Sequence, residues 1–329
     1  MGTIMVAGGA GYIGSHTLWL LRQRGHDAFA FDNLSEGHAS AVLDADLVRG
    51  DLADSALVER TLRERKVEAV FHFAAHCYVG ESVTAPAKYY QNNVVTTLSL
   101  LESMRRAEVP YFVFSSTCAT YGEPRQERMD ESHPQWPVNP YGWTKFMVER
   151  MLADFDRAYG LKSVCLRYFN AAGAHPEGVI GEDHDPETHL IPLVLGAAAG
   201  RRPPLKVFGS DWPTPDGSCI RDYIHILDLA DAHLRGLEYL RSGKPCAAFN
   251  LGNGAGYSVL EVIRAAEAVT GKKVPFELAP RRAGDPARLV GDCRRAAEVL
   301  GWKQAYADLP SILSSAWRWH ERHPDGFKD

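Results

Sequence analysis

Tyr141 and Lys145 are the residues of this chain whose types and spacing most directly suggest chemistry. They stand four positions apart in the segment NPYGWTK, so on a helix they would share one face. A free phenol has a pKa of about 10. A nearby ammonium favours the phenolate, and a phenol brought toward neutrality can act as a general base. The pair therefore predicts a site that removes a proton from a hydroxyl group.

The surroundings of this pair matter, because a lone Tyr-x-x-x-Lys pair is more often a solvated helix face. Asn139 is a suitable N-cap and Pro140 a suitable first helical residue, which places the pair in the first turns of a helix. A polar Ser-Ser-Thr run stands upstream at residues 115–117. In open α/β folds, chemistry is usually located where helices begin beside the sheet edge.

A glycine-rich turn, GGAGYIG at residues 8–14, supplies the second piece of chemistry. It follows an expected strand, opens an expected helix, and precedes a second strand that is followed by Asp32. Such glycines let the backbone approach a pyrophosphate, whose charge is met by the helix N-terminus. Asp32 can accept hydrogen bonds from both ribose hydroxyls and would repel a 2′-phosphate, which predicts NAD rather than NADP. The alternative is a glycine turn that only packs a helix on a strand.

The elements that must position these residues alternate along the first half of the chain. The expected strands are Thr3–Ala7, Ala28–Phe31, Ala69–Phe73, Tyr111–Phe114 and Ser163–Arg167, and the expected helices are Tyr12–Arg24, Leu57–Glu64, Lys88–Arg106 and Tyr141–Tyr159. Near-continuous apolar strands separated by helices are typical of a parallel sheet covered on both faces. We therefore predict an α/β fold with a Rossmann-type doubly wound parallel sheet.

The composition changes after Asn170, where glycine, proline and charge become more frequent. Helical patterns return at Ile191–Ala199, Asp228–Tyr239, Ser258–Thr270 and Arg294–Leu300. We expect an NAD-binding domain over residues 1–170, to which segments near 223–252 return. Residues 171–329 would mainly form a smaller α/β lobe that binds the substrate.

Composition excludes several classes of protein. The 329 residues carry a net charge of −5, which argues against nucleic acid as a partner. No apolar run approaches the roughly 20 residues that span a bilayer. The chain enters a strand at once, leaving no room for a signal peptide, and its six Cys are scattered, so we expect reduced thiols in a cytoplasmic protein. No His-x-x-x-His pair resembles a metal site, so no metal is expected.

Many further segments resemble the extended short-chain dehydrogenase/reductase superfamily and, within it, the UDP-glucose 4-epimerase family. They run nearly end to end and include GGAGYIGSH, FDNLS, VFHFAA, YYQNNV, FSSTCATYGEP, NPYGWTKFMVE, LRYFNAAGAHPEG, VFGSDWPTPDG, CIRDYIHILDLADAH and RRAGD. The resemblance implies an NAD-dependent isomerase that interconverts UDP-glucose and UDP-galactose. It would oxidise and re-reduce C4 of the sugar through a 4-keto intermediate.

The resemblance also implies residue roles. The catalytic residues would be Thr117, Tyr141 and Lys145. The cofactor would contact Gly8, Gly11, Tyr12, Ile13, Gly14, Asp32, Asn33, Asp51, Leu52, Phe73, Ala74, Ala75, Asn92, Ser115, Tyr141, Lys145 and Tyr168. The UDP-sugar would contact Thr117, Tyr141, Asn170, His189, Leu190, Phe208, Arg221, Tyr223, Arg282, Asp285 and Leu289. Arg221 and Arg282 suit pyrophosphate, because a guanidinium forks onto phosphate oxygens.

Four positions need comment against the family pattern. Cys77 stands where many members have a cofactor-contacting Lys, and His189 stands where Asn is frequent. Thr117 replaces the commoner catalytic Ser and keeps its hydroxyl. Leu289 falls where side-chain size controls access of N-acetylated sugars, and its intermediate bulk favours poor use of them.

Three alternatives remain at this stage. The TCATYGEP and AWRWH segments also resemble 4-epimerases of UDP-xylose and UDP-arabinose. A nucleotide-sugar 4,6-dehydratase shares the fold, but related dehydratases place Asp and Glu after the catalytic Thr, where this chain has Cys118 and Ala119. A non-catalytic NAD-binding protein would not need the Thr, Tyr and Lys together. The family resemblance further implies a homodimer built from the helices Lys88–Arg106 and Tyr141–Tyr159.

Overall fold

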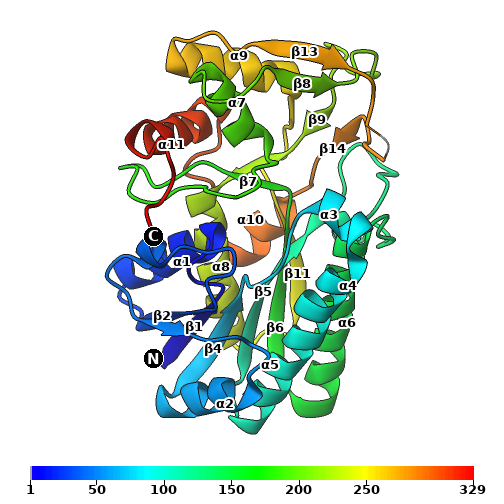
Figure 1. The fold of residues 1–329 in the computed structure, drawn as a ribbon. Helices are drawn as coiled ribbons and strands as arrows, with labels where there is room; N and C mark the ends of the chain where they lie inside the picture. Colours follow the sequence, from blue (N-terminus) through cyan, green and yellow to red (C-terminus); the bar gives the residue numbers. More distant parts are fainter. Residues whose placement is uncertain (1, 283) are drawn as a thin grey trace.

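A seven-stranded parallel sheet forms the centre of the larger lobe (Figure 1). The structure is a computed structural model that describes residues 2–282 and 284–329. The strand order is β11-β6-β5-β4-β1-β2-β3, formed by β1 (Thr3–Ala7), β2 (Ala28–Asp32), β3 (Leu47–Arg49), β4 (Val67–His72), β5 (Tyr111–Thr117), β6 (Lys162–Tyr168) and β11 (Ala247–Leu251). The predicted Rossmann-type α/β fold is confirmed.

Helices cover both faces of this sheet, because alternate side chains of each strand point to opposite sides. In β1, Ile4 and Val6 pack against α1 (Tyr12–Gln23) and α8 (Ile226–Arg241). Met5 belongs to the apolar core of the other face. That core is closed by α2 (Ser55–Glu64), α5 (Thr96–Arg106) and α6 (Pro140–Tyr159). Burial on both sides explains the continuous apolar strands of the sequence.

The predicted helix Lys88–Arg106 differs from the structure. The segment forms α4 (Pro86–Tyr89), a π-helical turn (Tyr90–Val95) and then α5. The side chain of Asn93 is buried in this turn, where its amide donates to the carbonyl of His76 and to Oγ1 of Thr144. A π turn widens the helix locally and is frequent at functional sites. Such a turn leaves no signature in helical periodicity, so the sequence pattern predicted one uninterrupted helix.

The smaller lobe has its own apolar core and lies above the carboxyl ends of the strands (Figure 1). It contains β7 (Asn170–Ala172), α7 (Leu190–Ala198), β8 (Leu205–Phe208), β9 (Ile220–Arg221), β10 (Tyr223–His225), β12 (Tyr257–Ser258), α9 (Val259–Thr270), β13 (Phe276–Ala279), β14 (Arg288–Leu289) and α11 (Leu309–Arg322). Helix α3 (Val79–Thr84) packs against α4 and α6 of the larger lobe. The sequence analysis did not predict α11, although Asp308 caps it and Pro310 stands in its first turn.

The chain crosses between the lobes more than once. After β10, α8 and β11 return to the large sheet, where β11 pairs with β6. Helix α10 (Arg294–Leu300) also packs against β11 and α8. The indole nitrogen of Trp302 then donates to the carbonyl of Asp228 at 2.9 Å. Residues near 294–302 therefore belong to the core of the larger lobe, a return that the sequence analysis did not anticipate.

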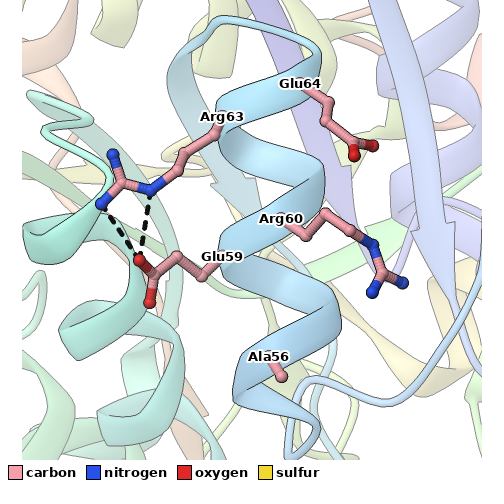
Figure 2. A pocket seen from close by; sticks show the side chains of 5 residues that line it. All are labelled: Ala56, Glu59, Arg60, Arg63 and Glu64. Carbon is pink, nitrogen blue, oxygen red and sulfur yellow. Dashed lines mark hydrogen bonds and ion pairs between the residues drawn. The ribbon is translucent and has the colours of Figure 1, made fainter.

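Charged side chains occupy the outer surface of α2, far from the smaller lobe. Glu59 and Arg63 pair one turn apart, whereas Arg60 and Glu64 point away from them (Figure 2). The residues lining this shallow pocket are nearly all charged and exposed to solvent. Such a surface is typical of a solvated helix face rather than of a ligand site.

One buried ion pair joins α6 to the sheet. The Arg167 guanidinium donates to both carboxylate oxygens of Glu149, at 2.9 and 2.6 Å, and to the hydroxyl of Tyr121 at 3.0 Å. Glu149 also accepts from Ser116 at 2.6 Å. Both charged side chains are only 7% exposed. The network fixes the helix that carries Tyr141 against the strand that ends in Thr117.

We expect Arg167→Met to reduce the free energy of unfolding by about 3–5 kcal/mol, because it leaves Glu149 charged, buried and uncompensated. Arg157→Met is the matched control, since Arg157 pairs with Asp154 on the exposed side of α6, the helix that carries Glu149. That change should cost less than about 1 kcal/mol. Urea unfolding of both variants is the measurement, and equal midpoints would contradict a structural role for the buried pair.

Candidate active site at the carboxyl edge of the sheet

Helix α6 presents Tyr141 and Lys145 on its buried face. The side chain of Asn139 accepts a hydrogen bond from the amide of Gly142 at 2.8 Å, and Pro140 occupies the first turn. This cap starts the helix one residue before Tyr141, so both site residues lie in its first two turns. Their side chains are almost completely buried.

Thr117 closes β5 at the same edge. Its Oγ1 accepts from the amide of Ala119 at 3.2 Å. The Lys145 ammonium donates to the backbone carbonyl of Ser115 at 2.8 Å and lies 4.9 Å from the centre of the Phe114 ring. The lysine therefore reaches under the last residues of β5, and the structure brings the three predicted catalytic residues together at one sheet edge.

Burial is the largest influence on the pKa of Tyr141. Burial raises the pKa of the Tyr141 phenol well above its ordinary value, and Tyr168 and Cys77 raise it further. A hydrogen bond with Thr117 acts in the opposite direction. Lys145 is not among the main influences on this pKa, because its ammonium is directed to the Ser115 carbonyl. The prediction that Lys145, helped by an oxidised nicotinamide ring, lowers the pKa of Tyr141 stays a prediction.

Lys145 keeps a positive charge in spite of its surroundings. Burial lowers its pKa to about 8, and Cys77 and Glu149 oppose that change. The ammonium is still the dominant form at pH 7. A buried cation of this kind favours any negative charge that develops beside it.

The glycine turn leaves the start of α1 open to an anion. A Cβ at Gly14 would stand 2.0 Å from the carbonyl oxygen of Gly8, and one at Gly8 would stand 2.5 Å from the amide nitrogen of Ala74. Gly11 provides no side-chain cap, and the first turn of α1 contains no acidic residue. The free amide groups of that turn fit the pyrophosphate of a dinucleotide.

Asp32 closes β2 beside this turn and is nearly buried. Its two oxygens accept from the amides of Ala10 at 2.9 Å and Leu34 at 2.8 Å. Burial raises the pKa of this carboxyl, and the backbone donors oppose the rise. Each oxygen retains a second lone pair, so the carboxylate can still accept from ribose hydroxyls. The residues present fit the adenosine half of NAD.

The other predicted cofactor residues lie at the same edge, most of them at or just after the end of a strand. They are Tyr12 and Ile13 after β1, Asn33 after β2, Asp51 and Leu52 after β3, Phe73, Ala74 and Ala75 after β4, Ser115 in β5, Tyr168 in β6, and Asn92 in the π-helical turn. Two pairs touch directly: Asn33 donates to Asp51 at 3.0 Å, and the hydroxyls of Ser115 and Tyr168 are 2.7 Å apart.

Two predicted substrate residues of the smaller lobe face each other across a short strand pair. Arg221 in β9 is the register partner of Leu289 in β14. Leu289 packs on the apolar cluster that contains Cys118, which follows Thr117 directly. The amide of Met129, from the larger lobe, donates to the carbonyl of Val290 at 3.0 Å. These contacts tie the expected sugar-gating position to the catalytic strand end.

Asp285 joins the two arginines expected to bind pyrophosphate. Its carboxylate lies 3.4 Å from Arg221 and 3.0 Å from Arg282. The Arg282 guanidinium also lies 5.7 Å from the centre of the Phe208 ring. Arg221 is mostly buried, and it donates to the carbonyl of Pro286 at 2.9 Å, whereas Arg282 is largely exposed. A second anion could exchange with Asp285 at both guanidinium groups.

The remaining predicted substrate residues border the same region. The amide of Asn170 donates to the carbonyl of Asp222 at 2.7 Å, and Tyr223 follows in β10 with its side chain buried. Leu190 begins α7, and His189 precedes it as the N-cap residue. Imidazole nitrogen Nδ1 of His189 lies 2.9 Å from Glu187, so its side chain turns back on its own loop.

Sequence reasoning missed two residues that shape the site. Asn93 fixes the π-helical turn, as described above, and its only sequence signal is the adjacent pair of asparagines. Glu182 is buried, and its carboxylate lies 3.1 Å from Nδ1 of His189. An acidic residue in a charged loop carries no pattern that would have singled it out.

The chain belongs to the NAD dependent epimerase/dehydratase family, whose model matches residues 4–252. Relatives of similar length include UDP-glucose 4-epimerases. The one from Halalkalibacterium halodurans is 51% identical over 324 residues, which cover 98% of this chain and 97% of the relative.

Two solved structures are similar over nearly their whole length. UDP-glucose 4-epimerase from Brucella ovis, in complex with NAD, has a TM-score of 0.95 at 50% identity, covering 96% of this chain and 98% of that one. UDP-glucose-4-epimerase from Stenotrophomonas maltophila, with bound NAD and formylated UDP-arabinopyranose, has a TM-score of 0.95 at 39% identity, covering 98% and 99%. Within residues 2–282 and 284–329, no helix is both long and apolar enough to cross a membrane.

We expect Gly14→Ala to weaken retention of NAD, because the added methyl group collides with the Gly8 carbonyl and must open the turn. Overpacking of this kind costs about 1–3 kcal/mol, which corresponds to roughly 5–150-fold in affinity. Gly80→Ala is the control, since a Cβ there meets nothing within 4 Å. NAD released per mole of denatured protein is the measurement, and equal retention by both variants would contradict the assignment of this turn.

Proposed function

We propose that this protein interconverts UDP-glucose and UDP-galactose by inverting C4 of the sugar, with NAD as its cofactor. Relatives that match it nearly end to end carry this activity in their names. The observation that carries the proposal is the convergence of three features at one sheet edge. These are the uncapped start of α1 beside Asp32, the Thr117–Tyr141–Lys145 set, and the Arg221–Leu289 pair of the smaller lobe.

Bound NAD+ would accept a hydride from C4 of the sugar and return it to the opposite face. Tyr141 would take the proton of the O4 hydroxyl and later give it back. Thr117, whose hydroxyl interacts with this phenol, would orient the same oxygen. Because each proton and hydride removed is restored, the reaction has no net redox change and the cofactor can stay bound.

The burial of Tyr141 sets the main energetic demand. Its ordinary pKa of about 10 lies three units above neutrality, worth roughly 4 kcal/mol. Burial adds to that amount. The phenolate therefore forms only when positive charge compensates it, and the buried ammonium of Lys145 and an oxidised nicotinamide ring would supply that charge together. This dependence would couple proton removal to the oxidised state of the cofactor.

Arg221, Arg282 and Asp285 would hold the pyrophosphate of the UDP-sugar between the lobes. Inversion requires the keto sugar to present both faces to the cofactor. Firm contacts at UDP and few polar contacts around the sugar satisfy this requirement, and the neighbours on the Leu289 side are apolar.

The alternatives have less support. A 4,6-dehydratase needs an acid and a base after Thr117, but here Cys118 is buried in an apolar cluster and burial raises its pKa to about 12. Such a thiol is neutral at pH 7, and its burial makes it a poor proton donor or acceptor for a substrate. A role on UDP-pentoses alone has no separate structural support, although a related UDP-glucose-4-epimerase binds a UDP-arabinopyranose derivative.

We also infer that the protein works as a cytoplasmic homodimer. Helices α5 and α6 pack side by side, and their outer surfaces carry exposed apolar side chains. Val95, at the start of α5, is 50% exposed, Leu98 42% and Met147 38%. Apolar residues gathered on two adjacent helices favour association with a second copy through the same surface. The six cysteines are free thiols, which suits a reducing compartment.

We expect purified protein to convert UDP-glucose to UDP-galactose without added NAD, and Tyr141→Phe to lower kcat by about 10²–10⁴-fold because it removes the group that accepts the proton. Tyr159→Phe is the control, because Tyr159 is exposed near the end of the same helix. Products are resolved by chromatography. Near wild-type epimerisation by Tyr141→Phe would contradict the mechanism, and accumulation of a dehydrated sugar would favour the dehydratase.

We expect Leu289→Ala to raise kcat/KM for UDP-N-acetylglucosamine relative to UDP-glucose by about tenfold. Removing three carbons makes room for the N-acetyl group, and differences of this size in a pocket are worth roughly 1–3 kcal/mol. Val299→Ala, an exposed apolar position on α10, is the control. An unchanged ratio for the two sugars would remove Leu289 from the sugar pocket.

A further inference from the structure

Four side chains that can bind metal ions converge in the loop before α7. They occur in the order Glu182, His184, Glu187 and His189, and one ligand atom of each lies within 4.8 Å of all the others. The expectation of no metal rested on His-x-x-x-His spacing, and a cluster in which Glu and His residues alternate does not have that spacing. The catalytic scheme proposed above uses none of these four groups chemically.

The distances within this cluster match the edges of a tetrahedral site. His184 Nδ1 lies 3.4 Å from an oxygen of each glutamate. His189 Nδ1 lies 3.1 Å from Glu182 and 2.9 Å from Glu187. A tetrahedral ion with ligand bonds of about 2.0–2.1 Å has ligand-to-ligand edges of about 3.4 Å. Glu182 turns the same oxygen, Oε1, to both imidazoles, whereas Glu187 turns Oε2 to His184 and Oε1 to His189. One ligand atom of each residue lies within 4.8 Å of the others, so one ion between them could contact all four groups after side-chain adjustment.

The orientation of His184 is an independent sign that the atoms face a common centre. Its Nδ1 atom is buried and makes no hydrogen bond, although two carboxylate oxygens are close. A protonated imidazole held only by ion pairing would gain by pointing its N–H at one carboxylate. Neither carboxylate receives such a bond, although an oxygen of each lies 3.4 Å from Nδ1.

Charge balance also suits a divalent cation. The carboxylates of Glu182 and Glu187 are only 5% and 4% exposed, so two buried negative charges need compensation. Two protonated histidines can provide it. One divalent cation with two neutral imidazoles gives the same net charge and four coordinate bonds.

We propose that Glu182, His184, Glu187 and His189 form a binding site for one divalent transition-metal ion, with Zn²⁺ as the preferred occupant. Two imidazole nitrogens and two carboxylate oxygens in a tetrahedral arrangement are a ligand set that Zn²⁺ accepts. Because all four ligands come from the protein and three are mostly buried, the site would be structural rather than catalytic.

The position of the cluster says what the ion would do. The ring of His184 makes an edge contact with Tyr12, at 6.1 Å between centroids, and another with Tyr78, also at 6.1 Å. Tyr12 opens α1 after the glycine turn and donates to the carbonyl of Gly173 at 2.6 Å. An ion here would hold the loop before α7 rigid against the dinucleotide turn, and so support closure of the smaller lobe.

The test uses tag-free holoprotein that has been treated with a chelator and then titrated with Zn²⁺ and, separately, Co²⁺. We expect one ion bound per chain, a rise in the thermal unfolding midpoint, and a Co²⁺ absorption spectrum with the intensity of a four-coordinate site. The double variant His184→Gln/His189→Gln should lose at least about tenfold in affinity, since even indirect ligand partners cost about 10–100-fold. His26→Gln, an isolated surface histidine, should bind as the wild type does.

Each outcome decides between an ion site and a charge-paired cluster. Absence of stoichiometric binding, or equal binding by the double variant, would overturn the proposal. If the double variant does not fold, the wild-type Co²⁺ spectrum decides, because a weak six-coordinate spectrum would also overturn it. NAD content and epimerase activity are measured on the same samples, so that failure of the metal site and failure of the proposed function are distinguished.

Discussion

Parallel pairing of the seven strands is the constraint on which the rest of the molecule depends. Parallel neighbours need a crossover between them, so every strand ends at the same edge of the sheet. The chain returns through helices on both faces, and the segments that follow the strands gather at that edge. The glycine turn, Asp32, Thr117 and Tyr168 come from different parts of the chain but meet there for this reason.

The chemistry at this edge depends on charge in a nearly dry environment. Burial raises the pKa of Tyr141 and lowers the pKa of Lys145, so it makes both charged forms less favourable. The same burial strengthens the attraction between a phenolate and an ammonium once both exist. The phenolate of Tyr141 would then form only when an oxidised cofactor adds its own positive charge. Tyr141 would therefore stay protonated in the absence of the oxidised cofactor.

Contacts on two sides hold strand β5, which ends in Thr117. Below it, the buried pair of Glu149 and Arg167 fixes α6 to the sheet through Ser116 and Tyr121. Above it, the short pair of β9 and β14 brings Leu289 to the cluster around Cys118. The smaller lobe is therefore not an independent module, because the side that carries Leu289 is assembled against residues of the larger lobe.

Local patterns in the sequence were enough to predict five of the seven strands, the dinucleotide turn and the Tyr141–Lys145 pair, but they did not predict β3 or β11. Continuous apolar strands require burial on both faces, glycines at fixed positions permit close backbone approach, and a spacing of four places Tyr141 and Lys145 on one helix face. All of these depend on residues near one another in the chain. The roles of more distant residues, such as Arg221 and Leu289, came from family resemblance.

Only the tertiary structure decided features that depend on contact between remote segments or on burial. The π-helical turn around Asn93 depends on the hydrogen bonds that the Asn93 side chain donates to His76 and Thr144. The direction of the Tyr141 pKa depends on how much water the folded protein excludes. The Glu182–His189 cluster depends on how its loop curls against Tyr12 and Tyr78. Periodicity and residue type do not predict such distances, because contacts between remote segments form only when the chain folds.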